Sequence, residues 1–142
     1  MAAKNSIIIF FLLVIASNCG WDKTKKDPTE NEPVIGELKI EDILVGPGEV
    51  VQKDNKIVVH YKGWLDDKKE FANSYNSGNP LIVTLGIGEL IKGWDQGLLG
   101  MRQGGIRRLT VPPHLGYGRR GVTNIPPHST LHFEVKLVNI LH

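Results

Sequence analysis

The sequence has too little cysteine and too little net charge for several protein classes. Cys19 is the only cysteine among 142 residues, which excludes a disulfide within the chain and any zinc site with several cysteine ligands. The formal net charge is only +2, so nucleic acid is not an expected partner. A chain of this length and ordinary composition fits one compact domain that rests on its own apolar core.

The motifs of several enzyme classes are also missing. The histidines show no HExxH or paired-cysteine spacing and there is no GxSxG elbow, so neither a metal site nor a nucleophilic triad is expected. Gly86-Ile87-Gly88 precedes a helical pattern, but Trp94 stands where a phosphate-binding loop needs lysine. Asp66, Asp67 and Glu70 lie among lysines, as in a solvated turn. The sequence therefore predicts no cofactor and no metal.

Residues 1–19 have the pattern of a secretory signal peptide. Lys4 precedes an unbroken apolar run over residues 7–16, which is shorter than the roughly 20 residues of a membrane-spanning helix. Cys19 resembles the lipid-modified cysteine of bacterial lipoproteins, although the residues three before it and directly before it depart from that motif. Two alternatives stay open: Cys19 carries a lipid, or an ordinary signal peptide is cleaved nearby.

Residues 20–33 are almost devoid of apolar side chains, and their positive and negative charges nearly cancel. This composition predicts a polar flexible tether rather than a basic membrane-binding arm. Residues 34–142 are the predicted domain. We expect an exported protein of the periplasm or cell envelope that contacts a membrane only through a lipid on Cys19. The alternative is a secreted protein or one of the secretory-pathway lumen.

Short runs of Val, Ile, Leu and Thr recur in the domain between Gly, Pro and Asn residues, as is typical of an antiparallel sheet. Residues 131–137 alternate most clearly between apolar and polar side chains, which predicts a strand that is covered on one face. Further strands are predicted over residues 37–44, 57–62, 81–85 and 106–111.

One segment has the helical period instead. Ile91, Trp94 and Leu98 lie at positions i, i+3 and i+7, which predicts a short amphipathic helix. Gly93 and Gly97 each lower the helix propensity by about 1 kcal/mol relative to alanine, so packing must hold this helix in place. The patterns together predict a sheet curled over one helix.

The domain also carries aromatic side chains on segments that such a fold could bring together. From their spacing alone, these residues are either ordinary core or the walls of an apolar pocket, and both alternatives stay open. They are Tyr61, Trp64, Phe71, Tyr75, Trp94, Tyr117 and Phe133.

Several longer motifs occur in a recognisable order. They are VVHYKGWL (58–65), KKEF before Ala72, LGIGELIKGWDQGLLGM (85–101), LTVPPHLGYGRRG (109–121) and IPPHSTLHFEVKL (125–137). The domain thereby resembles the FKBP-type peptidyl-prolyl cis-trans isomerases over nearly all of residues 34–142. The resemblance implies an α+β fold, in which a five- or six-stranded antiparallel sheet wraps around one short helix. It also implies isomerase (rotamase) activity without a cofactor.

The resemblance further implies an aromatic substrate pocket. Trp94 would form its floor, Tyr117 would donate its hydroxyl to a substrate carbonyl, and Ile91 would offer its backbone N–H. The implied pocket residues are Tyr61, Phe71, Leu90, Ile91, Trp94, Tyr117, Ile125 and Phe133. Two positions depart from the family pattern: Ala72 replaces an aspartate and Leu81 replaces a second phenylalanine. These departures bear on macrolide inhibitors such as rapamycin more than on basal activity.

We therefore predict a monomeric domain that accelerates X-Pro rotation in proline-containing segments of exported proteins, by non-covalent stabilisation of the twisted amide. The alternative is a binding module or chaperone that holds such segments with little turnover. Arg119 and Arg120 closely follow Tyr117, in a stretch with five arginines and no acid. This suggests a preference for acidic substrates, and the alternative is an ordinary solvated face.

Overall fold

The computed structural model describes residues 36–142, so the predicted signal peptide, the tether and Cys19 lie outside the described residues. The elements are β1 (Lys39–Leu44), β2 (Lys56–Leu65), β3 (Glu70–Asn73), α1 (Ser74–Ser77), β4 (Leu81–Thr84), α2 (Lys92–Gly97), β5 (Ile106–Val111), a 3-10 helix (Pro113–Leu115) and β6 (Leu131–Leu141). Among residues 36–142, no helix is long and apolar enough to span a membrane.

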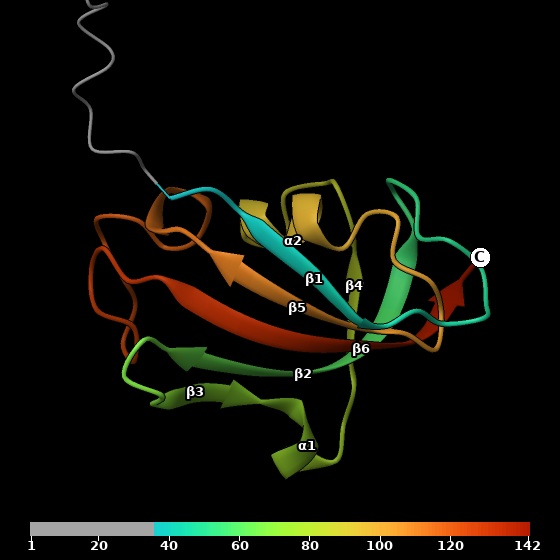
Figure 1. Ribbon diagram of the computed structural model, residues 1–142, viewed down its shortest axis with the longest axis horizontal. Helices are drawn as coiled ribbons and strands as arrows, with labels where there is room; N and C mark the ends of the chain where they lie inside the picture. Colours follow the sequence, from blue (N-terminus) through green and yellow to red (C-terminus); the bar gives the residue numbers. More distant parts are fainter. Residues whose placement is uncertain (1–35) are drawn as a thin grey trace, which may run out of the picture. The chain divides into compact units, whose positions relative to one another are not determined.

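All six strands belong to one antiparallel sheet (Figure 1). The order is β1-β5-β6-β2-β3, and β4 pairs with the first half of β2 while β3 pairs with its second half. The helix α2 packs on β5. This arrangement confirms the predicted α+β class with a six-stranded sheet and a short helix. The sequence did not predict β3 or α1, which are each only four residues long.

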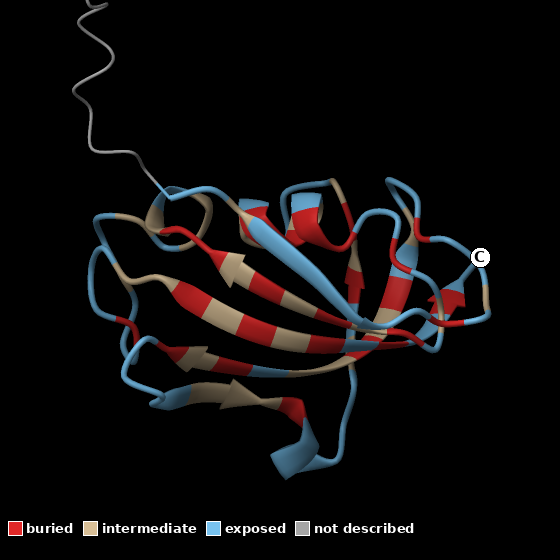
Figure 2. Ribbon diagram, in the orientation of Figure 1, coloured by how far each residue is buried: buried red, intermediate tan, exposed pale blue. Residues whose placement is uncertain are grey.

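The centre of the sheet supplies most of the core. Along β6, Leu131, Phe133, Val135 and Leu137 are buried, and the residues between them are half-buried or exposed. Figure 2 shows this alternation as bands along β6. β6 pairs with β2 on one side and with β5 on the other. The predicted one-sided strand therefore lies in the middle of the sheet.

Two glycines allow the backbone of α2 to touch the sheet. A Cβ atom at Gly93 would overlap the methyl groups of Val111, and one at Gly97 would lie 2.8 Å from a methyl carbon of Leu109. Side chains at these positions would push the helix away from β5. The glycines that weaken the helix in isolation are thus the residues that let it pack, and this packing buries Trp94 to 3% exposure.

Arg107 ties this helix to two strands. Its Nε and Nη2 atoms donate to the two carboxylate oxygens of Asp42 at 2.6 and 3.0 Å. Its Nη1 atom donates to the carbonyl oxygens of Gly97 and Leu99, each at 2.9 Å. The Arg107 residue is 7% exposed, so the interpretation of the arginine-rich stretch as a uniformly solvated face is wrong at this position. Its partner Asp42 lies far away in the sequence, which hides the pairing from local patterns.

The Gly93→Ala variant tests the contact between helix and sheet. Overpacking costs about 1–3 kcal/mol, and the better helix propensity of alanine offsets up to about 1 kcal/mol. We expect the free energy of unfolding in urea to fall by about 1–2 kcal/mol. The control is Gln96→Ala, at an exposed position of the same helix, which should change stability by less than about 0.5 kcal/mol. Equal stabilities of the two variants would contradict the close packing.

Candidate functional site

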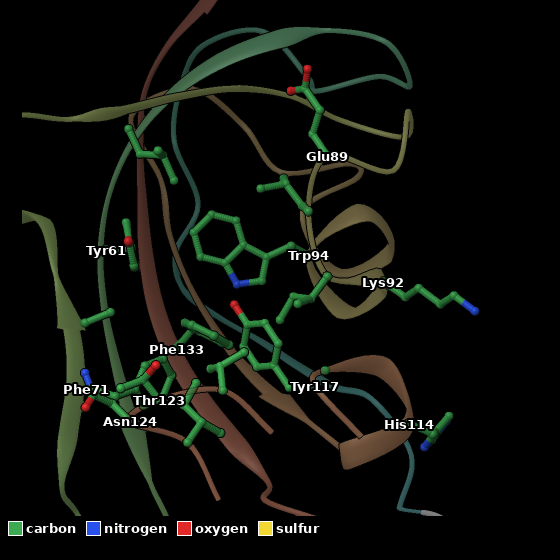
Figure 3. A pocket seen from close by; sticks show the side chains of 17 residues that line it. Tyr61, Phe71, Glu89, Lys92, Trp94, His114, Tyr117, Thr123, Asn124 and Phe133 are labelled. Atoms are coloured by element: carbon green, nitrogen blue, oxygen red, sulfur yellow. The ribbon is translucent and has the colours of Figure 1, made fainter. Parts of the chain in front are cut away.

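A cavity of about 730 Å³ opens between the sheet, the start of α2 and the loop that leads into β6 (Figure 3). All eight residues that the resemblance assigns to a pocket line this one cavity, and so do both departing positions. They are Tyr61, Phe71, Leu90, Ile91, Trp94, Tyr117, Ile125 and Phe133, with Ala72 and Leu81. The structure thus brings together residues from four strands, one helix start and one loop.

Edge-to-face ring contacts fix the floor and walls of the cavity. The Trp94 ring lies 5.1 Å from the Tyr61 ring and 5.3 Å from the Phe133 ring, at interplanar angles of 89° and 85°. Phe71 contacts Phe133 in the same manner, with ring centroids 5.6 Å apart. Aromatic pairs favour this geometry because the positive edge of one ring meets the negative face of the other. The rings therefore hold each other in place before any ligand arrives.

Gly63 on β2 makes room for two of these rings. A Cβ atom there would lie 2.8 Å from the Phe71 ring and 3.0 Å from the Phe133 ring. The sequence interpretation missed this residue, although a glycine inside a strand is a known sign of close approach by another group. Gly63 is therefore a shaping residue of the cavity.

The indole nitrogen of Trp94 is buried and has no hydrogen-bond partner in the described part of the chain. In Figure 3 it lies on the side of the ring that faces Tyr117 and Phe133. Unpaired buried polar atoms are uncommon, because leaving one without a partner costs about 1–3 kcal/mol. The cavity floor therefore consists of an apolar ring surface and one N–H donor that no acceptor in the described part of the chain satisfies.

Tyr117 brings a polar group to the mouth of the cavity. It is 40% exposed, and Figure 3 shows its hydroxyl directed into the cavity. Within residues 36–142 the hydroxyl has no hydrogen-bond partner, so it is available as a donor. The loop around it is fixed by backbone bonds from Gly118 N to Pro113 O and from His128 N to Gly118 O, each 2.8 Å long. Packing does not account for Tyr117, which supports the ligand-binding interpretation.

The start of α2 offers a second donor. Ile91 directly precedes the first helical residue, and its N–H donates to no acceptor among the described residues. The side chains of Leu90 and Ile91 pack partly buried against the core. A ligand carbonyl above these two residues would therefore meet an unpaired backbone N–H beside an apolar surface.

The two departures change one wall of the cavity. Ala72 lines the same cavity as Tyr61 and brings no polar side-chain group to it, and the Tyr61 hydroxyl has no hydrogen bond within residues 36–142. Burial raises the pKa of Tyr61 above its ordinary value of 10.0, and the nearby Tyr117 raises it further. Leu81 lies partly buried on the same side. Among the described residues, ring packing on Trp94 therefore positions the Tyr61 side chain, without a hydrogen bond of its hydroxyl.

A tight turn forms the part of the wall beside Phe71 (Figure 3). Val122 and Ile125 exchange backbone hydrogen bonds of 2.9 Å in both directions, and Ile125 is 5% exposed. Sequence reasoning identified Ile125 but missed its neighbours and several residues at the rim. The additional lining residues are Glu89, Lys92, His114, Gly116, Val122, Thr123 and Asn124. Most of them directly flank predicted pocket residues, which is the signal that could have found them.

Comparisons with known proteins agree on one family. The sequence model of the FKBP-type peptidyl-prolyl cis-trans isomerases matches residues 48–138. The chain is 49% identical over 107 residues to an FK506-binding protein of Neisseria meningitidis serogroup A, covering 75% of this chain and 98% of the relative. It is 48% identical over 110 residues to FK506-binding protein 1A of Neurospora crassa, covering 76% and 92%.

Solved structures give the same result. The crystal structure of AtFKBP13 superposes with a TM-score of 0.70 at 40% identity, covering 73% of this chain and 93% of that one. FkpA from Escherichia coli superposes with a TM-score of 0.68 at 44% identity, covering 72% of this chain and 47% of that one.

The raised pKa of Tyr61 predicts a pH effect on stability. Because the folded protein holds the phenolic proton more tightly than the unfolded chain, this contribution is complete below about pH 10 and is lost as the pH rises through the raised pKa. The stability of the wild type relative to Tyr61→Phe should therefore fall above about pH 10. Urea unfolding of both proteins between about pH 8 and 11 measures this difference in the free energy of unfolding. A difference that stays constant over this range would contradict the prediction.

Proposed function

This chain belongs to the family of FKBP-type peptidyl-prolyl cis-trans isomerases, and on that premise we propose that its aromatic cavity isomerises X-Pro bonds in exported proteins. The observation that carries the assignment of the site is the hydroxyl of Tyr117, which has no partner within residues 36–142 and is directed into a cavity whose floor is the buried ring of Trp94. Such a cavity suits an apolar ring that is flanked by carbonyl groups.

The chemistry requires no bond to the protein. Rotation about an amide faces a barrier of about 18–20 kcal/mol, because resonance gives the C–N bond double-bond character. Without catalysis an X-Pro bond exchanges over about 10–100 s. The twisted amide has lost this resonance and is less polar than the planar one. An apolar cavity that excludes water therefore favours the transition state over the ground state.

The residues of the cavity divide this task. The proline ring would lie on Trp94, between the rings of Tyr61 and Phe133, where it displaces water from an apolar surface. The Tyr117 hydroxyl and the Ile91 N–H would each donate to a carbonyl beside the proline, and so hold the peptide in the geometry in which the amide twists. No proton or group is transferred.

A peptide of the form X-Leu-Pro-Phe tests this assignment. Catalytic amounts of the protein should accelerate its cis-trans exchange, measured by NMR. Tyr117→Phe should lower kcat/KM about two- to tenfold, the effect of losing one hydrogen bond. Trp94→Phe keeps an aromatic floor of smaller area and should lower it as well.

The matched control is Tyr75→Phe. Tyr75 is also an exposed tyrosine, but it stacks on His60 at 4.6 Å and does not line the cavity. Removal of the Tyr75 hydroxyl should leave the rate of cis-trans exchange unchanged. Peptide binding without faster exchange would instead favour the binding module, in which the loss of a carboxylate at Ala72 leaves Tyr61 too loosely held for turnover.

FK506-type macrolides are further proposed ligands of this cavity. The relatives from Neisseria meningitidis and Neurospora crassa carry the name FK506-binding protein. Ala72 and Leu81 remove an acidic and an aromatic side chain from the wall that such a ligand would contact. We therefore propose weaker macrolide binding than in relatives that retain both side chains, with inhibition of peptide exchange as the measure.

We also propose export, with the domain acting as a monomer behind its tether. Support comes from the apolar run over residues 7–16 and from the polar composition of residues 20–33. A lipid on Cys19 would attach the protein to a membrane, and its clients would then be exported proteins that fold beside that membrane.

Cell fractionation tests the lipid. Full-length protein should sediment with membranes and incorporate a radiolabelled fatty acid, whereas Cys19→Ser should do neither and should remain exported. Ser17→Ala, two residues away, is the matched control and should behave as the wild type. Wild-type protein in the soluble exported fraction would contradict lipidation and favour an ordinary cleaved signal peptide.

A further inference from the structure

A second hollow of about 380 Å³ shares a wall with the aromatic cavity. Residues 122–125 line both hollows, so their tight turn is the shared wall. The other side of the second hollow is formed by the end of β2 and the turn that leads to β3, residues 65–69. We call this hollow the side groove, defined as the space between residues 65–69 and residues 120–127.

Hydrogen bonds fix both banks of the side groove. On one bank, Leu65 N donates to Lys69 O at 2.9 Å, and Lys69 N donates to a carboxylate oxygen of Asp67 at 2.9 Å. On the other bank, Gly121 has a φ of +61°, and a Cβ atom there would overlap the carbonyl oxygen of Ile125. The groove is therefore formed by ordered backbone on each side.

The side groove has a mixed polar and apolar lining with an excess of positive charge. Its apolar part consists of Leu65, Val122, Ile125 and two prolines. Lys69 and Arg120 are its cations, and neither takes part in an ion pair within residues 36–142. The single carboxylate, of Asp67, already accepts the backbone N–H of Lys69. The groove thus complements a side chain with an apolar stem and a negative end.

We propose that the side groove is a substrate subsite for an acidic residue of the peptide whose proline occupies the aromatic cavity, with Arg120 as the specificity-determining residue. This inference rests on the proposed function. The wall between the two hollows is one narrow hairpin, and paired strands lie about 5 Å apart. Because an extended peptide advances about 3.4 Å per residue, an acid two to four positions from the proline would reach the groove.

The structure also separates two neighbouring arginines. Arg120 lines the side groove, whereas Arg119 is exposed and lines neither hollow. Both carry the same charge at nearly the same place in the chain. A general attraction of acidic peptides by positive charge would depend on both residues, whereas a subsite depends on Arg120 and not on Arg119. Arg119 is therefore a matched control.

Three peptide series test the subsite, with Glu-Glu, Gln-Gln or Lys-Lys placed two to four residues from the proline on either side. At low ionic strength, the full chain should show a kcat/KM about two- to fivefold higher for the Glu than for the Gln series, the range expected of an exposed ion pair. Added salt should reduce this ratio. Arg120→Gln should reduce the excess of this ratio over one to less than half of its wild-type value, with Lys69 supplying the remainder, whereas Arg119→Gln should leave the ratio unchanged. The Gln series should be turned over equally by the wild type and by Arg119→Gln.

Each contrary result has one meaning. Equal turnover of the Glu and Gln series by the wild type would overturn the subsite and leave the isomerase assignment intact. An equal loss of preference in both arginine variants would overturn it in favour of general charge attraction. If no peptide exchanges faster, the isomerase assignment fails, and the Kd values of the same peptides by NMR titration still decide the subsite. Tighter binding of the Glu series that depends on Arg120 supports it, and equal Kd values overturn it.

Discussion

The close approach of α2 to β5 is the contact on which the site depends. Gly93 and Gly97 bring the helix backbone against Val111 and Leu109, at a distance that leaves no room for a side chain at either glycine. Trp94 stands between these glycines and is thereby placed under the rings of β2 and β6. Arg107 then holds the end of the helix through its carbonyl oxygens, and joins it to β1. The cavity floor is a direct product of this packing.

The cavity separates two tasks that other enzymes often combine. Its floor and part of its walls are aromatic rings that pack on one another. One hydrogen-bond donor, the Tyr117 hydroxyl, stands at the mouth, on a loop that is fixed through its own backbone hydrogen bonds. A reaction that needs only a less polar environment and a fixed peptide geometry can proceed in such a site without an ionised catalytic group.

The sequence could predict the elements whose side chains alternate or repeat over many residues. The alternation along 131–137 and the helical spacing from Ile91 to Leu98 both correspond to real elements, because each is set by one-sided burial. β3 and α1 escaped prediction, since four residues are too few to show a period. The end of β2 and the last residues of β6 were also missed, because their side chains alternate less clearly.

The aromatic residues show where local patterns fail and where they could have succeeded. Trp64 lies three positions after Tyr61 on β2, and an odd spacing puts two side chains on opposite faces of a strand. Trp64 accordingly stacks on His132, 6.0 Å away, and does not line the cavity. Tyr75 likewise stacks on His60. Which face becomes the cavity depends on the packing of α2, and only the family resemblance carried that information.

The position of β1 has a mechanical consequence. The chain enters the described domain through this strand, which has a single neighbour, β5, at the edge of the sheet. A pulling force that arrives from residues 20–33 would act first on the β1–β5 hydrogen bonds and on the bidentate bond between Asp42 and Arg107. It would have to break these before it reached β6 and the rings around Trp94. If the protein is attached through those residues, as proposed above, the edge strand would carry the load before the cavity did.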